Sequence, residues 1–402
     1  MYEVLFLIKR TAYLKQLSDF KDKNLIKVIT GIRRSGKSIL LKQFYDYLKA
    51  SGVAEDRIVM INFESLHYEK IKDYQALYQH ISKLITPNKT TYILLDEIQE
   101  VINWEKALAS FQVDFQCDIY ITGSNAYMLS SELATYISGR YVEMHILPLS
   151  FREYLSGVKT DKELAFKHYL EYGGLPGLLE FYNREDLFRH YMEGVYNTIV
   201  IKDIIGRSSI KETDLLESIL LYMIDNIGNL ISANNIANYL TSSGRKTYVS
   251  TVIEYLESLE KAFVLYKAKR YNIKGKRLLR SPYKYYLADV GFRNIALGRR
   301  EMDIGRVLEN IVFLELKRRG YDLKIGIESN FEVDLVASRG TEKGYYQVCL
   351  SIADDDVMKR ELRSLQMIKD SYPKFLLTMD FHLKEEIGGI KLLNIRDFLL
   401  ED

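Results

Sequence analysis

One segment constrains the fold more than any other: GIRRSGKS, from Gly31 to Ser38. The run before it, Leu25–Thr30, is short, apolar and β-rich, the pattern of a strand buried on both faces. The stretch after it, ILLKQFYDYLKA, has apolar residues at helical spacing. A strand, a glycine loop and a helix in this order are the context that a phosphate-binding loop requires, and these flanks disfavour a chance match in a turn.

The residue types in this loop predict a nucleotide site. Gly31 and Gly36 let the backbone fold its N–H groups around phosphates, at the positive end of the following helix. Lys37 supplies a point positive charge, and Ser38 supplies a hydroxyl for Mg²⁺. We therefore predict that ATP and Mg²⁺ bind at the loop residues Gly31, Ile32, Arg33, Arg34, Ser35, Gly36, Lys37, Ser38 and Ile39.

The second half of such a site is an apolar strand that ends in a carboxylate, and TYILLDEIQE (Thr91–Glu100) has this form. We predict that Asp96 holds Mg²⁺ through water and that Glu97 orients and deprotonates the attacking water. A buried strand that merely ends in an acidic turn is the alternative. The position after the phosphate loop favours the nucleotide site, and the adjacent Asp-Glu pair favours hydrolysis.

Two more strands, Arg57–Phe63 and Asp118–Thr122, complete a predicted parallel sheet in a three-layer α/β/α core. An added strand between the phosphate-loop strand and the acidic strand is typical of the ATPase division that includes AAA-type enzymes. In that division a polar residue after the next strand senses the γ-phosphate. Ser124 or Asn125 fits this role, and an ordinary turn is the alternative.

Two other polar side chains are candidates for the site. Asn62, at the end of its strand, is a candidate to restrain Glu97 until a ligand arrives. Arg140 lies in a loop before the expected strand Val142–Leu147. An arginine in such a loop reaches a γ-phosphate either in its own subunit or in a neighbour of a homo-oligomer. A surface arginine or a salt bridge explains Arg140 equally well.

The middle of the chain reads as helices followed by a hairpin. Leu164–Ile204 is a helical pattern interrupted by a Gly173–Gly177 break, which we interpret as a hinge. Farther on, the helix Ser232–Leu240, a short turn, a second helix and two strand-like runs joined by Ile273–Lys276 follow in the winged-helix order.

The segment Lys261–Lys284 contains nine Lys or Arg residues and no acidic residue, although the whole chain has a net charge of only +2. A basic wing of this kind can follow the phosphate backbone of duplex DNA. The preceding helix, however, carries Glu254, Glu257 and Glu260, which would repel phosphates unless they face away. A protein partner and a solvated basic face therefore stay as alternatives.

The order of these motifs resembles the predicted AAA-type ATPases of archaea and bacteria that carry a C-terminal domain of unknown function. The resemblance runs from about residue 10 to about residue 350 and rests on GIRRSGKS, YILLDEIQE, ITGSNAYMLS, SGRY with LPLSFREYL, YGGLPG, VSTVIEYLESLEKAFVLYKAKRY, SPYKYYLADVGF and LENIVFLEL…FEVDLV. It implies a P-loop ATPase core, a winged helix and a nuclease-like end domain. It supplies no substrate.

The end of the chain resembles the restriction-endonuclease-like α/β layout, in which Glu, Asp and Glu-x-Lys gather metal ions. Glu309 and Asp334 match its first two positions, but Gln347 and Cys349 stand at the last pair. A neutral amide replaces a carboxylate ligand there, and no lysine is present in the pair to activate water. We expect a degenerate domain used for binding or architecture.

These features predict an α/β multidomain chain with an ATPase core (1–157), a helical linker (158–215), a winged helix (216–295) and a nuclease-like domain (296–402). The leading hypothesis is an ATP-hydrolysing protein that couples nucleotide state to a DNA-binding winged helix. The alternatives are a signalling or scaffold ATPase with a protein partner, and an ATP-dependent nuclease. The sequence has no signal peptide and no apolar run long enough to span a membrane, so we expect a cytoplasmic protein.

Overall fold

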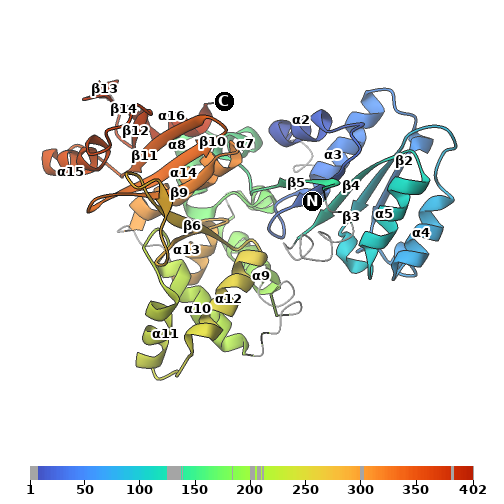
Figure 1. Cartoon of the computed structure of the whole chain (residues 1–402), viewed down its shortest axis with the longest axis horizontal. Coiled ribbons are helices and arrows are strands. Elements are labelled where there is room, and N and C mark those ends of the chain that lie inside the picture. Colours follow the sequence, from blue (N-terminus) through green and yellow to red (C-terminus); the bar gives the residue numbers. More distant parts are fainter. Residues whose placement is uncertain are drawn as a thin grey trace. The chain divides into compact units, whose positions relative to one another are not determined.

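The computed structural model describes residues 8–124, 137, 139–182, 184–199, 204–205, 210, 212–298, 303–381 and 384–401. Within these residues the chain forms two compact units (Figure 1). The first unit comprises Met1–Pro148, Leu175–Glu180 and Lys261–Phe263, and the second comprises Leu149–Gly174, Phe181–Glu260 and Val264–Asp402. The four-domain division expected from the sequence stays a prediction.

A five-stranded parallel sheet forms the centre of the first unit, with strand order β2-β3-β4-β1-β5. Its strands are β1 (Ile26–Thr30), β2 (Ile58–Asn62), β3 (Thr91–Asp96), β4 (Cys117–Gly123) and β5 (Tyr141–His145). The strand β4 lies between β1 and β3, so the strand before the phosphate loop and the acidic strand are not neighbours. Because all strands are parallel, the segments that follow β1, β3 and β4 meet at one edge of the sheet.

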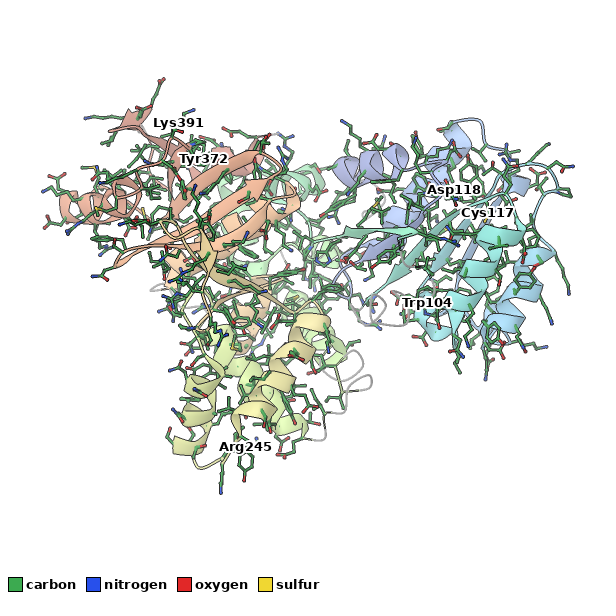
Figure 2. The ribbon with its side chains drawn as sticks, in the orientation of Figure 1. Trp104, Cys117, Asp118, Arg245, Tyr372 and Lys391 are labelled. Carbon is green, nitrogen blue, oxygen red and sulfur yellow. The ribbon has the colours of Figure 1, made fainter. Side chains whose placement is uncertain are left out.

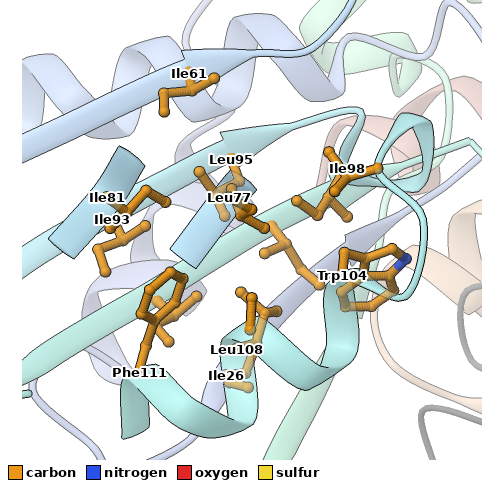
Figure 3. Close-up of a cluster of buried hydrophobic side chains, with 14 of the residues drawn as sticks. Ile26, Ile61, Leu77, Ile81, Ile93, Leu95, Ile98, Trp104, Leu108 and Phe111 are labelled. Carbon is orange, nitrogen blue, oxygen red and sulfur yellow. The ribbon is translucent and has the colours of Figure 1, made fainter. Parts of the chain in front are cut away.

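Helices cover both faces of this sheet, as the expected three-layer core requires (Figure 1). One face packs against α4 (Tyr74–Ser82) and α5 (Trp104–Asp114), through apolar residues that Figure 3 shows in close-up. The other face packs against α2 (Thr11–Asp19) and α3 (Lys37–Ala50). The strands β1 and β3 are buried along their whole length, which explains their near-continuous apolar sequences.

A buried charged pair lies at the opposite end of the sheet from the phosphate loop. The Lys27 ammonium, near the start of β1, forms an ion pair with Asp118. Asp118, labelled in Figure 2, lies near the start of β4. The Tyr120 hydroxyl also donates to Asp118, at 2.9 Å. This pair is therefore a part of the core and not of the candidate site.

The second unit contains helices and a large mixed sheet. The helices are α7 (Phe151–Gly157), α8 (Lys162–Tyr172), α9 (Glu185–Thr198), α10 (Thr213–Asp225), α11 (Ala233–Ser242), α12 (Val249–Lys261), α13 (Gly291–Leu297), α14 (Ile304–Arg318), α15 (Asp355–Gln366) and α16 (Ile395–Leu400). A capping box at Ser232 and Asn235 fixes the start of α11, where the sequence predicted a helix cap. None of the described helices is long and apolar enough to cross a membrane.

The nine-stranded sheet of this unit has the path β13-β14-β12-β11-β10-β9-β6-β7, with β8 paired to β6. Its strands are β6 (Leu265–Asn272), β7 (Arg277–Leu278), β8 (Lys284–Leu287), β9 (Asp322–Glu328), β10 (Phe331–Arg339), β11 (Glu342–Val348), β12 (Lys374–Thr378), β13 (Glu386–Ile387) and β14 (Ile390–Asn394). The expected hairpin is present, since β6 pairs antiparallel with β7 and β8. It is not a separate wing, because β6 also pairs in parallel with β9.

Candidate nucleotide site

Two glycines give the loop after β1 its shape. Gly31 has φ 149°, and a β-carbon built on it would lie 2.2 Å from the Ile146 carbonyl oxygen. Gly36 has φ 95°, in the left-handed region, and it is the N-cap residue of α3. Both positions therefore favour glycine for conformational reasons. The turn at Gly36 places the positive end of α3 directly after the loop, where it would face a phosphate.

Lys37 and Ser35 show that the loop has the chemistry to receive a phosphate. The buried Lys37 ammonium donates to the carbonyl oxygens of Gly31 and Ile32, at 3.0 and 3.1 Å. Both contacts come from the loop itself and are replaceable by phosphate oxygens. The Ser35 hydroxyl is fully buried and has no hydrogen-bond partner among the described residues. Such an orphaned donor fits a loop that binds an anion.

The other loop residues differ in their exposure. Ile32 is buried, and Ile39 is half-buried. Arg33 is buried and forms an ion pair with Glu64, at 3.6 Å between Nη1 and Oε1. Arg34 is exposed and has φ 68°. The two arginines of the motif thus differ, since only Arg34 faces solvent.

Asp96 is buried at the carboxyl end of β3 and has polar partners on both neighbouring strands. The Thr122 hydroxyl of β4 donates to its Oδ1, and the Asn62 amide of β2 donates to its Oδ2 at 2.8 Å. Burial raises the pKa of Asp96, while the hydrogen bonds from Thr122 and Ser38 act in the opposite direction. The carboxylate is therefore held rigidly beside Ser38, the other residue predicted to bind Mg²⁺.

Glu97 is buried and is held by two side chains. The Ser124 hydroxyl lies 3.0 Å from its Oε1 and 2.9 Å from its Oε2, and the Gln99 amide donates to Oε2. Burial acts to raise the pKa of Glu97, but the Lys37 ammonium and the hydrogen bonds from Gln99 and Ser124 outweigh it, so this pKa lies below the ordinary value. The hydrogen bonds from Ser124 and Gln99 thus hold the Glu97 carboxylate in one position directly after Asp96.

Asn62 and Arg140, the two other polar candidates, do not make the contacts expected from the sequence within this chain. Asn62 does not restrain Glu97 in this structure, because its amide donates to Asp96 instead. Arg140 is exposed and precedes β5, where Tyr141 is in register with Ile26 at the start of β1. Arg140 is therefore separated from the phosphate loop by the length of β1, about 13 Å at the usual rise per residue. We therefore correct the expectation that Arg140 reaches a phosphate bound to its own chain. A role of Arg140 at the phosphate of a neighbouring subunit stays a prediction.

Asn125 lies outside the described residues, so its role as a phosphate sensor stays a prediction. Ser124, the other candidate for that role, is fully buried at the end of β4 and contacts Glu97. Ser124 lies between the loop after β1 and the end of β3 because β4 is the strand between β1 and β3 in the sheet.

Two residues beside the loop were not found from the sequence. The buried Arg10 donates to the carbonyl oxygens of Ser35 and Leu147, at 3.0 and 2.8 Å, and so fixes the loop from outside. Pro176 lies next to Gly36, since a β-carbon built on that glycine would be 3.5 Å from the Pro176 ring. Pro176 belongs to the break that the sequence identified as a hinge, but nothing in a single sequence places it at the loop.

The basic segment Lys261–Lys284 is only in part a basic surface. Lys284 is buried, and Lys267 forms an ion pair with Glu260 at 3.0 Å, so neither is available to phosphates. Five other basic residues of the segment are exposed, at and near the β6–β7 turn: Lys269, Lys274, Lys276, Arg277 and Arg280. The prediction of a continuous basic wing is therefore corrected to a basic hairpin tip.

The end of the chain brings together the two acidic residues noted from the sequence. Glu309 of α14 and Asp334 of β10 both contact the Lys284 ammonium, at 2.9 and 3.4 Å. Gln347 lies beside them, and its Oε1 accepts from the Asp334 amide at 3.3 Å. The presence of Lys284 here could not be predicted from the sequence, because this residue lies on β8, 25 positions before Glu309.

The parallel sheet, the glycine loop, Lys37 and the carboxylates after β3 define a P-loop nucleotide-binding fold. Residues 23–155 match a family model described as an AAA domain, and residues 163–303 match one described as a domain of unknown function. The Walker-type ATPase of Pyrococcus abyssi has a similar fold, with a TM-score of 0.50 at 16% identity over 72% of this chain and 95% of that chain.

Two relatives that match most of the chain show its family. An uncharacterised protein of Haemophilus influenzae is 42% identical, over 98% of this chain and 99% of its own length. An uncharacterised protein of Methanocaldococcus jannaschii is 30% identical, over 86% of this chain and 79% of its own length. The chain therefore belongs to one family with these relatives, and within it residues 23–155 form an AAA domain.

Proposed function

We propose that this protein binds ATP with Mg²⁺ and hydrolyses ATP to ADP and phosphate. The observation that carries the proposal is the buried Glu97 carboxylate, which Ser124 holds directly after the buried Asp96. A protein that only binds nucleotide needs the lysine and Asp96 but has no need of a second carboxylate held as a base. The AAA-domain match over the same residues supports this assignment.

Each residue has a separate task in this reaction. Lys37 and the loop N–H groups bind the phosphates and neutralise charge on them. Glu97 orients a water molecule and accepts its proton at a carboxylate oxygen, and Ser124 positions Glu97. Mg²⁺, when bound with ATP, would be held by Ser38 and Asp96 and would neutralise charge on the phosphate oxygens.

We further propose that nucleotide state is coupled to duplex DNA. The helices α11 and α12 and the hairpin of β6 and β7 follow one another in the winged-helix order. The exposed basic tip of that hairpin supports contact with a phosphate backbone, because each cation that meets a phosphate adds a salt-dependent term to the affinity.

A protein partner is the second candidate, and the face of α12 supports it. Ile253 is 45% exposed on this helix, and Glu254 and Glu257 are exposed beside it. Exposed apolar residues next to carboxylates are unfavourable against a phosphate backbone and suit a protein surface. In this case the basic hairpin tip would bind an acidic surface.

The test is the steady-state ATPase rate with and without duplex DNA, using Lys37→Ala as the blank. Lys37→Ala should abolish nucleotide binding, because it removes the cation that meets the phosphates. Hydrolysis no faster than this blank would contradict the ATPase proposal. A several-fold increase in the rate with DNA would support coupling to DNA. A rate that ignores DNA would contradict the coupling and support the protein-partner candidate.

A further inference from the structure

Two of the places where the chain passes from one unit to the other are joined to each other. The chain enters the second unit between Pro148 and Leu149, and it returns to the first between Gly174 and Leu175. The Leu149 amide donates to the Gly174 carbonyl oxygen at 2.7 Å. The two crossings therefore form one connection and not two independent linkers.

Asp289 holds this connection within the second unit. Its buried carboxylate accepts from the Gly174 amide at Oδ2, at 2.7 Å, and from the Gly291 amide at Oδ1, at 2.8 Å. A β-carbon built on Gly173 would overlap the same carboxylate, and this glycine has φ 83°, so no side chain fits there. The break at Gly173–Gly177 is thus anchored at its start by Asp289.

The other side of the connection contacts the phosphate loop within the first unit. Pro176 is buried, and a β-carbon built on Gly36 would lie 3.5 Å from its ring. Before the other crossing, the Leu147 carbonyl oxygen accepts from Arg10, which also donates to the Ser35 carbonyl oxygen. Each crossing therefore lies close along the chain to a contact with the loop.

We propose that Asp289 is a positioning residue for the nucleotide site, which acts through Gly174 and Pro176 on Gly36 of the phosphate loop. This proposal rests on the proposed function, because it assigns Asp289 a part in nucleotide binding. The path is short: one hydrogen bond to Gly174, and then the backbone to a proline whose ring fixes its own φ. Pro176 in turn packs on the N-cap residue of α3.

Such coupling acts in both directions. A phosphate bound by the loop N–H groups favours one position of Gly36, and therefore one position of the Pro176 ring packed beside it. Asp289 favours that same position, and so raises the affinity for nucleotide. Bound nucleotide then stabilises the contacts of Asp289 by the same factor. The break at Gly173–Gly177 is in this way the element that reports the nucleotide state to the second unit.

Asp289→Asn tests this role with almost no change in side-chain size. Each oxygen of Asp289 accepts one backbone N–H, whereas asparagine has one oxygen and one NH₂ group, so one backbone N–H would face another donor. Asn310→Asp is the matched control. The buried Asn310 amide pairs with the N–H and C=O of Leu287, at 2.8 and 2.9 Å, and a carboxylate would likewise oppose one acceptor.

The measurement is the Kd of the full chain for the unhydrolysed ATP analogue AMP-PNP with Mg²⁺, by isothermal calorimetry. Asp289→Asn should weaken binding about fivefold or more, within the usual range of coupling between sites. Asn310→Asp should lower the unfolding temperature and keep the wild-type Kd. A wild-type Kd in Asp289→Asn, or an equal loss in both variants, would overturn the proposal alone. A wild type that binds no nucleotide would contradict the proposed function, and this proposal with it.

A double-mutant cycle shows whether Asp289 acts through Pro176. Pro176→Ala removes the ring beside Gly36, so adding Asp289→Asn to this variant should change the Kd by less than about twofold. A further loss as large as that of Asp289→Asn alone would show that the two residues act independently, which contradicts the proposed route.

Hydrogen exchange of the wild type decides the question if Asp289→Asn does not fold. With exchange resolved to single amides, saturating AMP-PNP and Mg²⁺ should slow exchange at Gly174 and Gly291 by about fivefold or more, as reciprocal coupling requires. The Leu287 amide, which donates to Asn310, is the internal control and should exchange at one rate in both conditions. Unchanged exchange at Gly174 and Gly291 in a protein that binds the analogue would refute the proposal.

Discussion

The Ser124 hydroxyl lies within hydrogen-bond distance of both carboxylate oxygens of Glu97, 3.0 Å from Oε1 and 2.9 Å from Oε2. One short side chain at the end of β4 thus contacts the base predicted at the end of β3. We expect Ser124→Ala to lower kcat by roughly 10- to 150-fold, because a hydrogen bond to a charged group contributes about 1.5–3 kcal/mol. Steady-state kinetics with separate measurement of the nucleotide Kd checks this, and a weaker Kd with unchanged kcat would contradict a positioning role.

Glu97→Gln should retain nucleotide binding and stop turnover. The amide keeps the size of the side chain but cannot accept the proton of the attacking water, so kcat should fall by roughly 10²–10⁴-fold. Glu100→Gln is the matched control, since Glu100 is exposed three residues farther along. Hydrolysis by Glu97→Gln at a rate near that of Glu100→Gln would remove Glu97 from its proposed role.

Gly31→Ala should disrupt the loop. The added methyl group would lie 2.2 Å from the Ile146 carbonyl oxygen, and φ 149° is unfavourable for alanine. We expect the nucleotide Kd to rise by about tenfold or more. Gly194→Ala, in the middle of α9, is the control, because its β-carbon would meet nothing within 4 Å. Equal nucleotide affinities in the two variants would show that the loop tolerates the methyl group.

The exposed hairpin tip can be tested by charge reversal. If duplex DNA binds there, glutamate at Lys274, Lys276 and Arg277 should weaken binding and reduce the salt slope by roughly 0.9 for each lost phosphate contact. The control is the same change at three exposed lysines of the first unit, Lys70, Lys83 and Lys89. Fluorescence anisotropy at several salt concentrations gives both quantities, and an equal loss in the two variants would indicate nonspecific charge alone.

The stability of the second unit should depend on pH through Asp334. Burial and the neighbouring Glu309 carboxylate raise the pKa of Asp334 to about 7. Folding therefore takes up a proton between the unfolded pKa, about 4, and pH 7. The contribution of Asp334 to stability is highest below pH 4 and falls as the pH rises to 7. It then stays constant.

Asp334→Asn should flatten this part of the profile, because asparagine does not titrate. Thermal unfolding of the wild type and the variant between pH 4 and pH 8 checks the difference. Asp355→Asn, at an exposed position, should leave the profile as it is in the wild type. Parallel profiles for the wild type and Asp334→Asn would exclude Asp334 as the titrating group.

The strands and the loop of the candidate nucleotide site could be predicted from the sequence because each of them is a local pattern. The strand Ile26–Thr30, which leads into the loop Gly31–Ser38, and the strand Thr91–Asp96 are both runs of buried residues followed by polar residues. The strand predicted at Leu25–Thr30 is observed at Ile26–Thr30. The contacts between these segments were harder to foresee, since Asn62 contacts Asp96 and not Glu97.

The end domain shows why the rest could not be predicted. The sequence places Lys284 at the end of the predicted basic wing, but β8 pairs inside the unit and buries this residue. Its partners, Glu309 and Asp334, lie 25 and 50 positions away along the chain. No periodicity in the sequence links such distant positions, because their proximity arises from strand pairing.

The pairing of β6 on both edges has a consequence for how any signal would be transmitted. Its hydrogen bonds to β7 and β8 on one side and to β9 on the other make the basic hairpin an extension of a single stiff sheet. A force applied at the hairpin tip is therefore delivered to β9 and β10 through backbone hydrogen bonds, with no hinge between them. The hairpin and the end domain should therefore move as one rigid body.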